Sequence, residues 1–158
     1  MSTATPTNAP PAVPSPTGRR VLVLHESGPA AEAALDLARE LDLHERATVT
    51  VVAVAPSAPS GSRCGGSALE FNQAVREIVE DELDVARRRL DHASGRTDYE
   101  LLVEGEDPPL ERWIAARDFD LILLPARRRP LRAHGHPAAA RLRGVTHAEV
   151  RVVQRRSS

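Results

Sequence analysis

The sequence predicts an α/β fold, a three-layer sandwich in which a five-stranded parallel sheet lies between two layers of helices. Two observations support this. Short apolar runs alternate strictly with longer segments of helical periodicity along the chain. The run Leu121–Leu124 is apolar at every position, which is typical of a strand covered on both faces, as in parallel sheets. Right-handed crossovers between parallel strands then place helices on both faces of the sheet.

The first three predicted elements are a strand, a helix and a second strand. Val21–Leu24 is apolar, and Pro29 after it suits the first turn of a helix. The helix is predicted over 30–43, because apolar residues recur there at helical spacing. Ala47–Ala55 is dense in β-branched residues and is predicted to be the second strand.

A loop rich in Ser, Pro and Gly over 56–66 leads into the longest predicted helix, which runs from an N-cap at Ser67 to about Ala93. Acidic residues at 80–82 precede arginines at 87–89, an order that suits the helix dipole. Its predicted buried side has spacings of four and three and consists of Phe71, Val75, Val79, Leu83, Ala86 and Leu90.

The remaining elements continue the alternation and end with a strand. A short helix is expected after Pro108, with Leu110, Trp113 and Ile114 pointing inward. The other predicted elements are strands at Tyr99–Val103, Asp120–Leu124 and Val150–Val153 and a helix at Pro137–Arg143.

Composition divides the chain into three parts. Residues 1–18 carry no charged side chain and lack the basic start and apolar centre of a secretion signal, so we expect a disordered tail. Residues 19–154 form the predicted domain, and 155–158 are a short basic end. No segment approaches the roughly 20 apolar residues that cross a bilayer. The single cysteine, Cys64, fits a reducing compartment, so we expect a cytoplasmic protein without membrane contact.

Charge is unevenly distributed along a chain whose formal net charge is −1. Residues 126–158 contain nine arginines and one acid, Glu149, and lysine is absent from the whole chain. This basic quarter can attract an anion, or it can complement acidic helices of the same molecule or of a partner subunit. Nucleic-acid binding is not favoured, because aromatic residues are few and no helix carries a base-reading face.

Four segments of Arg19–Val153 resemble the universal stress protein family, and their order and spacing carry the resemblance. It implies a Rossmann-like fold of the adenine nucleotide alpha hydrolase-like type. The segments are Arg20–Leu24 with Glu26, Glu104–Pro108 followed by Ile114 and Ala115, Asp118–Leu124, and Val150–Val153.

The departures from the family pattern lie in its phosphate loop. ATP-binding members carry Gly-x-x-Gly and then Gly-Ser or Gly-Thr after the fourth strand, and those glycines let main-chain amides approach phosphate. Here the resemblance puts Pro125 and Arg128 at the first two glycines, and His136-Pro137, or at best Gly135-His136, at the third. Proline has no N–H to offer. The chain therefore resembles the branch of the family that dimerises without binding ATP.

The candidate binding residues lie at the predicted carboxyl edge of the sheet, where ligands of open α/β sheets sit. Guanidinium groups there can clamp phosphate or carboxylate. The alternative is a solvated basic loop that meets acids of a neighbouring subunit. If the chain binds nucleotide, the resemblance implies that Val51 and Ala53 flank adenine, Glu26 binds ribose or metal, and residues 125–138 hold phosphate. The full set of candidates is Glu26, Val51, Ala53, Pro125, Arg127, Arg128, Arg129 and His136.

No motif in the sequence indicates a catalytic group or a metal site. His134 and His136 lack further ligands at metal-site spacing, so a plain surface loop is favoured. Cys64 follows Arg63, which can favour the thiolate, but an exposed thiol without a redox role is the preferred interpretation. Trp113 and Phe71 are predicted to be packing residues.

The final strand, Val150–Val153, predicts a homodimer. In the family this strand often pairs with its copy across a two-fold axis, which buries an edge that otherwise invites aggregation. The alternative is an edge that Arg151 and Glu149 protect.

We therefore expect a non-catalytic, homodimeric stress or regulatory module that needs no cofactor, contacts a protein partner, and does not bind ATP in the family's usual way. The alternative is a nucleotide-binding member that takes ATP with Mg²⁺ on an arginine-based phosphate site and has at most weak ATPase activity.

Overall fold

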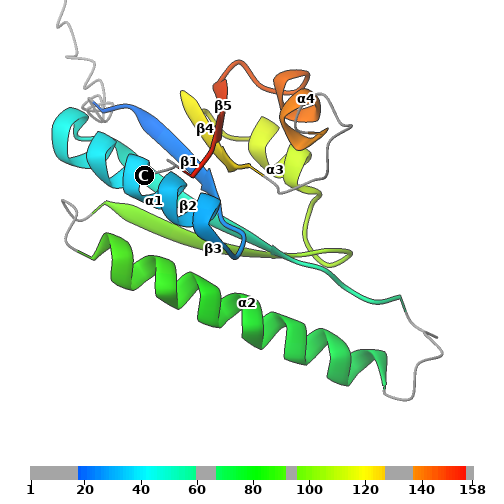
Figure 1. The fold of residues 1–158 in the computed structure, drawn as a ribbon. Coiled ribbons are helices and arrows are strands. Elements are labelled where there is room, and N and C mark those ends of the chain that lie inside the picture. The colour runs from blue at the N-terminus through cyan, green and yellow to red at the C-terminus, as the bar shows by residue number, and fades with distance from the viewer. Residues whose placement is uncertain (1–17, 60–66, 92–95, 127–136, 156–158) are drawn as a thin grey trace, which may run out of the picture.

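A computed structural model describes residues 18–59, 67–91, 96–126 and 137–155. Strands and helices alternate through these residues as predicted, and the α/β fold class is confirmed (Figure 1). The predicted tail, apart from Gly18, lies outside these ranges, as do Cys64 and the histidines at 134 and 136. The strands are β1 (Arg20–Leu24), β2 (Thr48–Ala55), β3 (Thr97–Val103), β4 (Leu121–Pro125) and β5 (Glu149–Val153). The helices are α1 (Pro29–Glu45), α2 (Ala68–Leu90), α3 (Leu110–Ala115) and α4 (Pro137–Arg143).

The sheet is parallel throughout, in the order β3-β2-β1-β4-β5. The chain starts at the central strand, moves to the β3 edge, and then returns to the other side of β1. Val21 therefore pairs with Val49 of β2 on one side and with Leu121 of β4 on the other. Connections leave β1 and β4 in opposite directions, so the sheet has a topological switch point between them, the place where open α/β sheets commonly bind ligands.

Alternate residues of each strand enter two separate cores, because successive side chains point to opposite faces of a sheet. Val21 and Val23 belong to the core beneath α1 and α2, whereas Leu22 and Leu24 belong to the core beneath α3 and α4. Figure 1 shows these two helix pairs on opposite faces of the sheet. Both layers thus bury the central strands completely, which accounts for their unbroken apolar sequences.

The N-terminal half of α2 corrects one sequence prediction. Phe71 was expected in the core and is 53% exposed. The 23 residues of α2 span about 34 Å at about 1.5 Å per residue, longer than the seven-residue strand β3 at about 23 Å. The helix therefore extends past the sheet (Figure 1), and its fully buried positions begin only at Val79. Ser67 caps it as predicted, accepting a hydrogen bond from Glu70 N.

The other aromatic prediction is confirmed, since Trp113 is 5% exposed and packs in the core beneath α3 and α4. Pro29 begins α1 as predicted. Element ends differ from the expected ones by a few residues, as helix and strand ends commonly do. None of the helices in the described part of the chain is long and apolar enough to span a membrane.

We predict that replacing Arg46 by glycine stabilises the protein. Arg46 ends α1 in the left-handed conformation, with φ 51° and ψ 41°, and its side chain is exposed. A residue with a Cβ pays a steric cost there that glycine avoids, so a gain of about 1 kcal/mol is expected. Urea denaturation measures it. Arg46→Ala is the control, since it removes the same side chain but keeps the Cβ; an equal gain in both variants would contradict the explanation.

Candidate functional site

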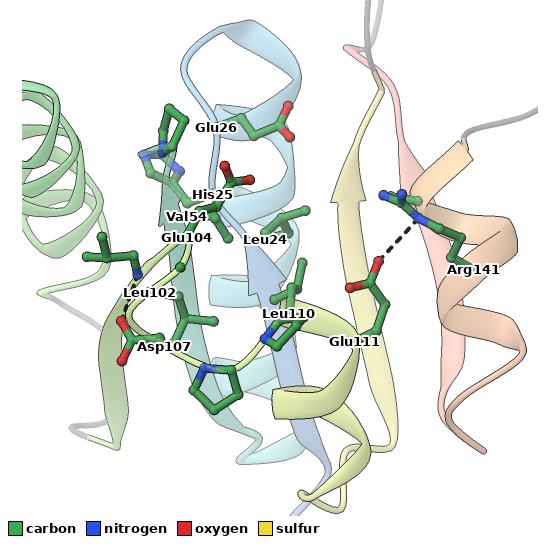
Figure 2. Close-up of a pocket in the computed structure, with 16 residues that line it drawn as sticks. Leu24, His25, Glu26, Val54, Leu102, Glu104, Asp107, Leu110, Glu111 and Arg141 are labelled. Carbon is green, nitrogen blue, oxygen red and sulfur yellow. Dashed lines mark hydrogen bonds and ion pairs between the residues drawn. The ribbon is translucent and has the colours of Figure 1, made fainter. Parts of the chain in front are cut away.

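A cavity of about 570 Å³ opens at the carboxyl edge of the sheet, beside the ends of β1, β2 and β3 and the starts of α3 and α4 (Figure 2). Its size is in the range of small-molecule sites. The residues that line it are Leu24, His25, Glu26, Val54, Pro56, Leu102, Val103, Glu104, Gly105, Asp107, Pro108, Pro109, Leu110, Glu111, Ala138 and Arg141.

Backbone hydrogen bonds hold the strand ends that form one wall of the cavity. His25 N donates to Val52 O at 2.8 Å, which extends the pairing of β1 with β2 by one residue. Glu104 N donates to Ala55 O at 3.0 Å, which does the same for β2 and β3. The polar residues that follow β1 and β3 therefore start from a rigid sheet rather than from free loops.

A tight turn after β3 forms the next part of the wall. The amides of Glu106 and Asp107 donate to Val103 O at 3.2 and 2.9 Å, and the carboxylate of Asp107 accepts from Val103 N at 2.7 Å. Gly105 in this turn has φ 82°, a conformation that residues with a Cβ rarely adopt. The Pro108-Pro109 pair then leads into α3, so the turn has little freedom to move.

Carboxylates dominate the charge of the described residues that line the cavity. Among these residues, Glu26, Glu104, Asp107 and Glu111 are acidic, and Arg141 carries the one guanidinium. Arg141 Nε lies 3.2 Å from Glu111 Oε1, and Figure 2 shows this ion pair on the side of the cavity where α3 meets α4. Arg141 is thus already paired with an acid, and the described residues around the cavity carry a net negative charge.

His25 is the buried polar residue of the site. It is 7% exposed, and its Nδ1 atom has no hydrogen-bond partner. Burial lowers the pKa of His25 below its ordinary value, although the carboxylates of Glu82 and Glu26 favour the charged form. Glu82 also accepts a hydrogen bond from the Ser27 hydroxyl, which ties α2 to the end of β1. The side chain of His25 therefore lies beside α2, where burial favours the neutral imidazole.

The predicted site residues fall into three groups. Glu26 lines the cavity. Val51 and Ala53, expected beside a base, are 0% and 1% exposed in the core beneath α1 and α2 and do not line it. Val54, one residue further along β2, lines it instead. Because successive side chains of a strand point to opposite faces of the sheet, Val51 and Ala53 share one face and Val54 lies on the other.

The other predicted residues belong to the connection between β4 and α4. Pro125 is the buried last residue of β4, paired with Val153 of β5. Arg127, Arg128, Arg129 and His136 lie outside the described residues.

The residues predicted to bind a ligand did not include His25, Glu104 or Arg141, which line the cavity. The signal for the first two was their position directly after strands of a parallel sheet, whose carboxyl ends share one edge. Arg141 had no comparable signal, because it reaches the site from α4, an element that only the tertiary fold brings there. Within the described ranges no group of three or more residues could hold a metal ion.

Comparison with known proteins connects this fold to one family. Residues 18–153 match the model of the universal stress protein family. No curated protein matches the chain.

Three solved structures illustrate the structural similarity. A universal stress protein family member from Burkholderia pseudomallei has 24% identity and a TM-score of 0.67, over 89% of this chain and 98% of that one. UspA from Lactobacillus plantarum has 18% identity and a TM-score of 0.68, over 88% and 99%. A family protein from Arabidopsis thaliana with AMP bound has 11% identity and a TM-score of 0.53, over 88% and 93%. At these identities the likeness concerns the fold.

Proposed function

The chain belongs to the universal stress protein family, and we propose that it is a non-catalytic, homodimeric member that does not hold ATP in the family's usual way. Its role is then that of a stress or regulatory module that acts through binding. The observation that carries this proposal is the carboxylate lining of the carboxyl-edge cavity.

Like charges disfavour a triphosphate at this edge. Glu26 follows β1 and Glu104 follows β3, the strands on either side of β2, and both line the cavity, as does Glu111 of α3. A triphosphate placed there would lose its hydration beside negative groups. By the resemblance, Pro125 and Arg128 stand at two of the glycines whose main-chain amides would offset this.

Calorimetric titration with ATP and Mg²⁺ tests the nucleotide part of the proposal. We expect no binding in the micromolar range, for the wild type and for Arg128→Ala alike. Micromolar binding that is lost in Arg128→Ala would contradict the proposal and establish an arginine-based phosphate site. Release of phosphate from ATP, followed in the same samples, should equal the rate in buffer alone.

The dimer is proposed to form through β5, an edge strand of the sheet. Glu149 N donates to Asp120 O and Val153 O accepts from Ala126 N, so these two residues direct their backbone toward β4. Because backbone direction alternates along a strand, Val150 and Val152 present theirs to the open edge. Arg143 already donates to Val150 O at 3.3 Å, which leaves Val152 as the centre of a two-fold pairing.

We predict that Val152→Pro converts the dimer to a monomer. Proline removes the N–H that points away from β4 and leaves the pairing with β4 intact, as edge strands tolerate. Sedimentation velocity measures the change in mass, and circular dichroism checks the fold. Val152→Ala shortens the same side chain but keeps the N–H, so it should remain dimeric. A monomeric wild type, or a dimeric Val152→Pro, would contradict pairing through β5.

The alternative is a nucleotide-binding member, and the AMP-bound relative with the same fold is the observation that favours it. Glu26 lies in the cavity where the resemblance places a ribose or metal ligand. In that case AMP should bind with an affinity that falls in Glu26→Gln, and Mg²⁺ should strengthen the binding of ATP.

A further inference from the structure

We propose that the open edge of β3 binds an extended segment of a partner protein as an added strand, and that basic and apolar residues alternate in this segment. This deepens the proposed function and rests on it, because it names the kind of partner for a module that acts through binding. Three features of the edge carry the inference: unpaired backbone groups, a small cavity beside them, and carboxylates along the strand.

The backbone of β3 offers hydrogen-bonding groups on the side away from the sheet. This strand lies at the edge opposite β5, with α2 running along it (Figure 1). Val49 N donates to Arg96 O, and Glu104 N donates to Ala55 O, so the even-numbered residues pair with β2. Backbone direction alternates along a strand, so other residues turn their N–H and C=O groups outward, where no described residue pairs with them. These are Thr97, Tyr99 and Leu101.

The turn after β3 closes the edge at its carboxyl end. Val103 is the next residue whose backbone points outward. Its N–H donates to the carboxylate of Asp107 at 2.7 Å, and its carbonyl oxygen accepts from the amides of Glu106 and Asp107. The chain thus satisfies these groups itself and leaves the edge open over Thr97–Leu101. An open edge of this kind is a template for another strand, and a segment of about six residues covers it.

A cavity of about 250 Å³ lies beside the open edge, between β3 and α2. Tyr99 and Leu101 contribute to it from the strand, where they pack against the core beneath α1 and α2. The guanidinium of Arg87, 5.1 Å from the centroid of the Tyr99 ring, forms part of its rim. Its volume is below the range of about 300–1,000 Å³ for small-molecule sites, but it has room for one apolar side chain. Every second side chain of an added strand would point to this face.

The other face of β3 carries the charge that selects the partner. Leu102 enters the core beneath α3 and α4, so Asp98 and Glu100 lie on that face too, and both are exposed. They are the charged residues of β3, and neither has an ion-pair partner among the described residues. A second copy of β3 would set like charges opposite one another, which destabilises strand pairing, whereas basic residues there are favoured. The edge therefore fits a basic segment rather than its own copy.

Three short synthetic peptides test the proposal on the full chain. They are Lys-Val-Lys-Leu-Lys-Val-Lys, the same peptide with glutamate in place of lysine, and Lys-Lys-Lys-Lys-Val-Leu-Val, which has the basic composition without the alternation. We expect the alternating basic peptide to bind at least about tenfold more tightly than either of the others, and its advantage over the glutamate peptide to shrink as salt is added. Equal affinities, or no binding at millimolar concentration, would overturn the proposal.

Amide hydrogen exchange followed by NMR reports how the peptide binds. The outward amides of Tyr99 and Leu101 should exchange at least about tenfold more slowly in the complex, because they gain a partner. The amide of Glu100 already pairs with β2 and should change much less. Binding without slower exchange of the outward amides would rule out strand addition. Outward amides that are protected in the free protein, and lose this protection on dilution, would show that a second copy occupies the edge and would also overturn the proposal.

Substitutions on both partners locate the contacts. Glu100→Gln removes a charge with little change of shape and should weaken the alternating basic peptide several-fold. Glu40→Gln, the same change at an exposed position of α1, is the matched control and should leave the affinity as it is. An equal loss in both variants would indicate a general effect of charge and overturn the assignment to β3. Alanine in place of the central leucine of the peptide should also weaken binding, and an unchanged affinity would contradict a role for the cavity.

The two proposals fail separately in these experiments. Micromolar ATP binding contradicts the proposed function whatever the peptides do. Absence of peptide binding in a dimer that does not bind ATP overturns strand addition at β3 and leaves the proposed function standing.

Discussion

Replacing Trp113 by alanine is expected to lower the free energy of unfolding by about 3–5 kcal/mol, the range for buried tryptophan. Trp113 is 5% exposed and anchors α3, a helix of six residues that has few other buried side chains. Its ring stacks on Phe119 with centroids 6.0 Å apart, and the guanidinium of Arg117 lies 3.8 Å from its centroid on the surface side. Removal leaves a void in the core beneath α3 and α4 that a short helix cannot close.

Urea denaturation measures the loss as a lower midpoint at an unchanged slope. Arg117→Ala is the comparison, since it removes the cation above the ring and a hydrogen bond to Trp113 O but keeps the buried surface. Exposed cation–π contacts are worth about 0.5–1 kcal/mol, so its effect should be several times smaller. If Trp113→Ala cost less than about 1 kcal/mol, α3 would not depend on this anchor.

The fold could be predicted because its signals are local and repeat. Each central strand of the sheet is apolar on both faces. The structure explains this, because successive residues such as Val23 and Leu24 enter two different cores. The helices show the other period, with Pro29 and Ser67 at their starts. When strand and helix patterns alternate along one domain, few folds are possible, and the three-layer sandwich with a parallel sheet is one of them.

The candidate site could be predicted only in part, because its residues come from five elements. Glu26, two residues after the predicted strand Val21–Leu24, lines the cavity. Val51 and Ala53 lie in the core beneath α1 and α2, and Val54 lines the cavity. In a strand buried on both faces, hydropathy does not tell which side of the sheet a residue faces. Arg141 and its pairing with Glu111 depend on how α4 packs beside α3, which no local pattern reveals.

Phe71 shows what helical periodicity in the sequence cannot predict. Its spacing continues the buried side of α2, so the sequence alone places it in the core. Its 53% exposure follows from the length of β3, which ends before the helix does. Periodicity reports which side of a helix is apolar, and the neighbouring elements decide how far along the helix that side is covered.

His25 is expected to make the protein less stable as the pH falls below about 6.5, the ordinary pKa of histidine. Burial lowers the pKa of His25 in the folded protein, so the unfolded chain binds a proton in this range that the folded protein does not. The contribution of the neutral His25 to the free energy of unfolding is thus complete above the ordinary pKa of histidine. It is lost as the pH falls toward the lower pKa that His25 has in the folded protein. One proton limits the slope to about 1.4 kcal/mol per pH unit. Asp36 does not contribute to the pH dependence in this range, because the hydrogen bond from Arg89 lowers its pKa below the ordinary value of 3.8.

Urea denaturation of the wild type and His25→Phe between about pH 7.5 and 5.5 isolates this contribution. His25→Phe should flatten the slope, because it keeps a ring at the position and removes the titrating group. His44→Gln, which replaces an exposed histidine of α1, should leave the slope as it is. A wild-type slope that survives in His25→Phe would assign the pH dependence to another group.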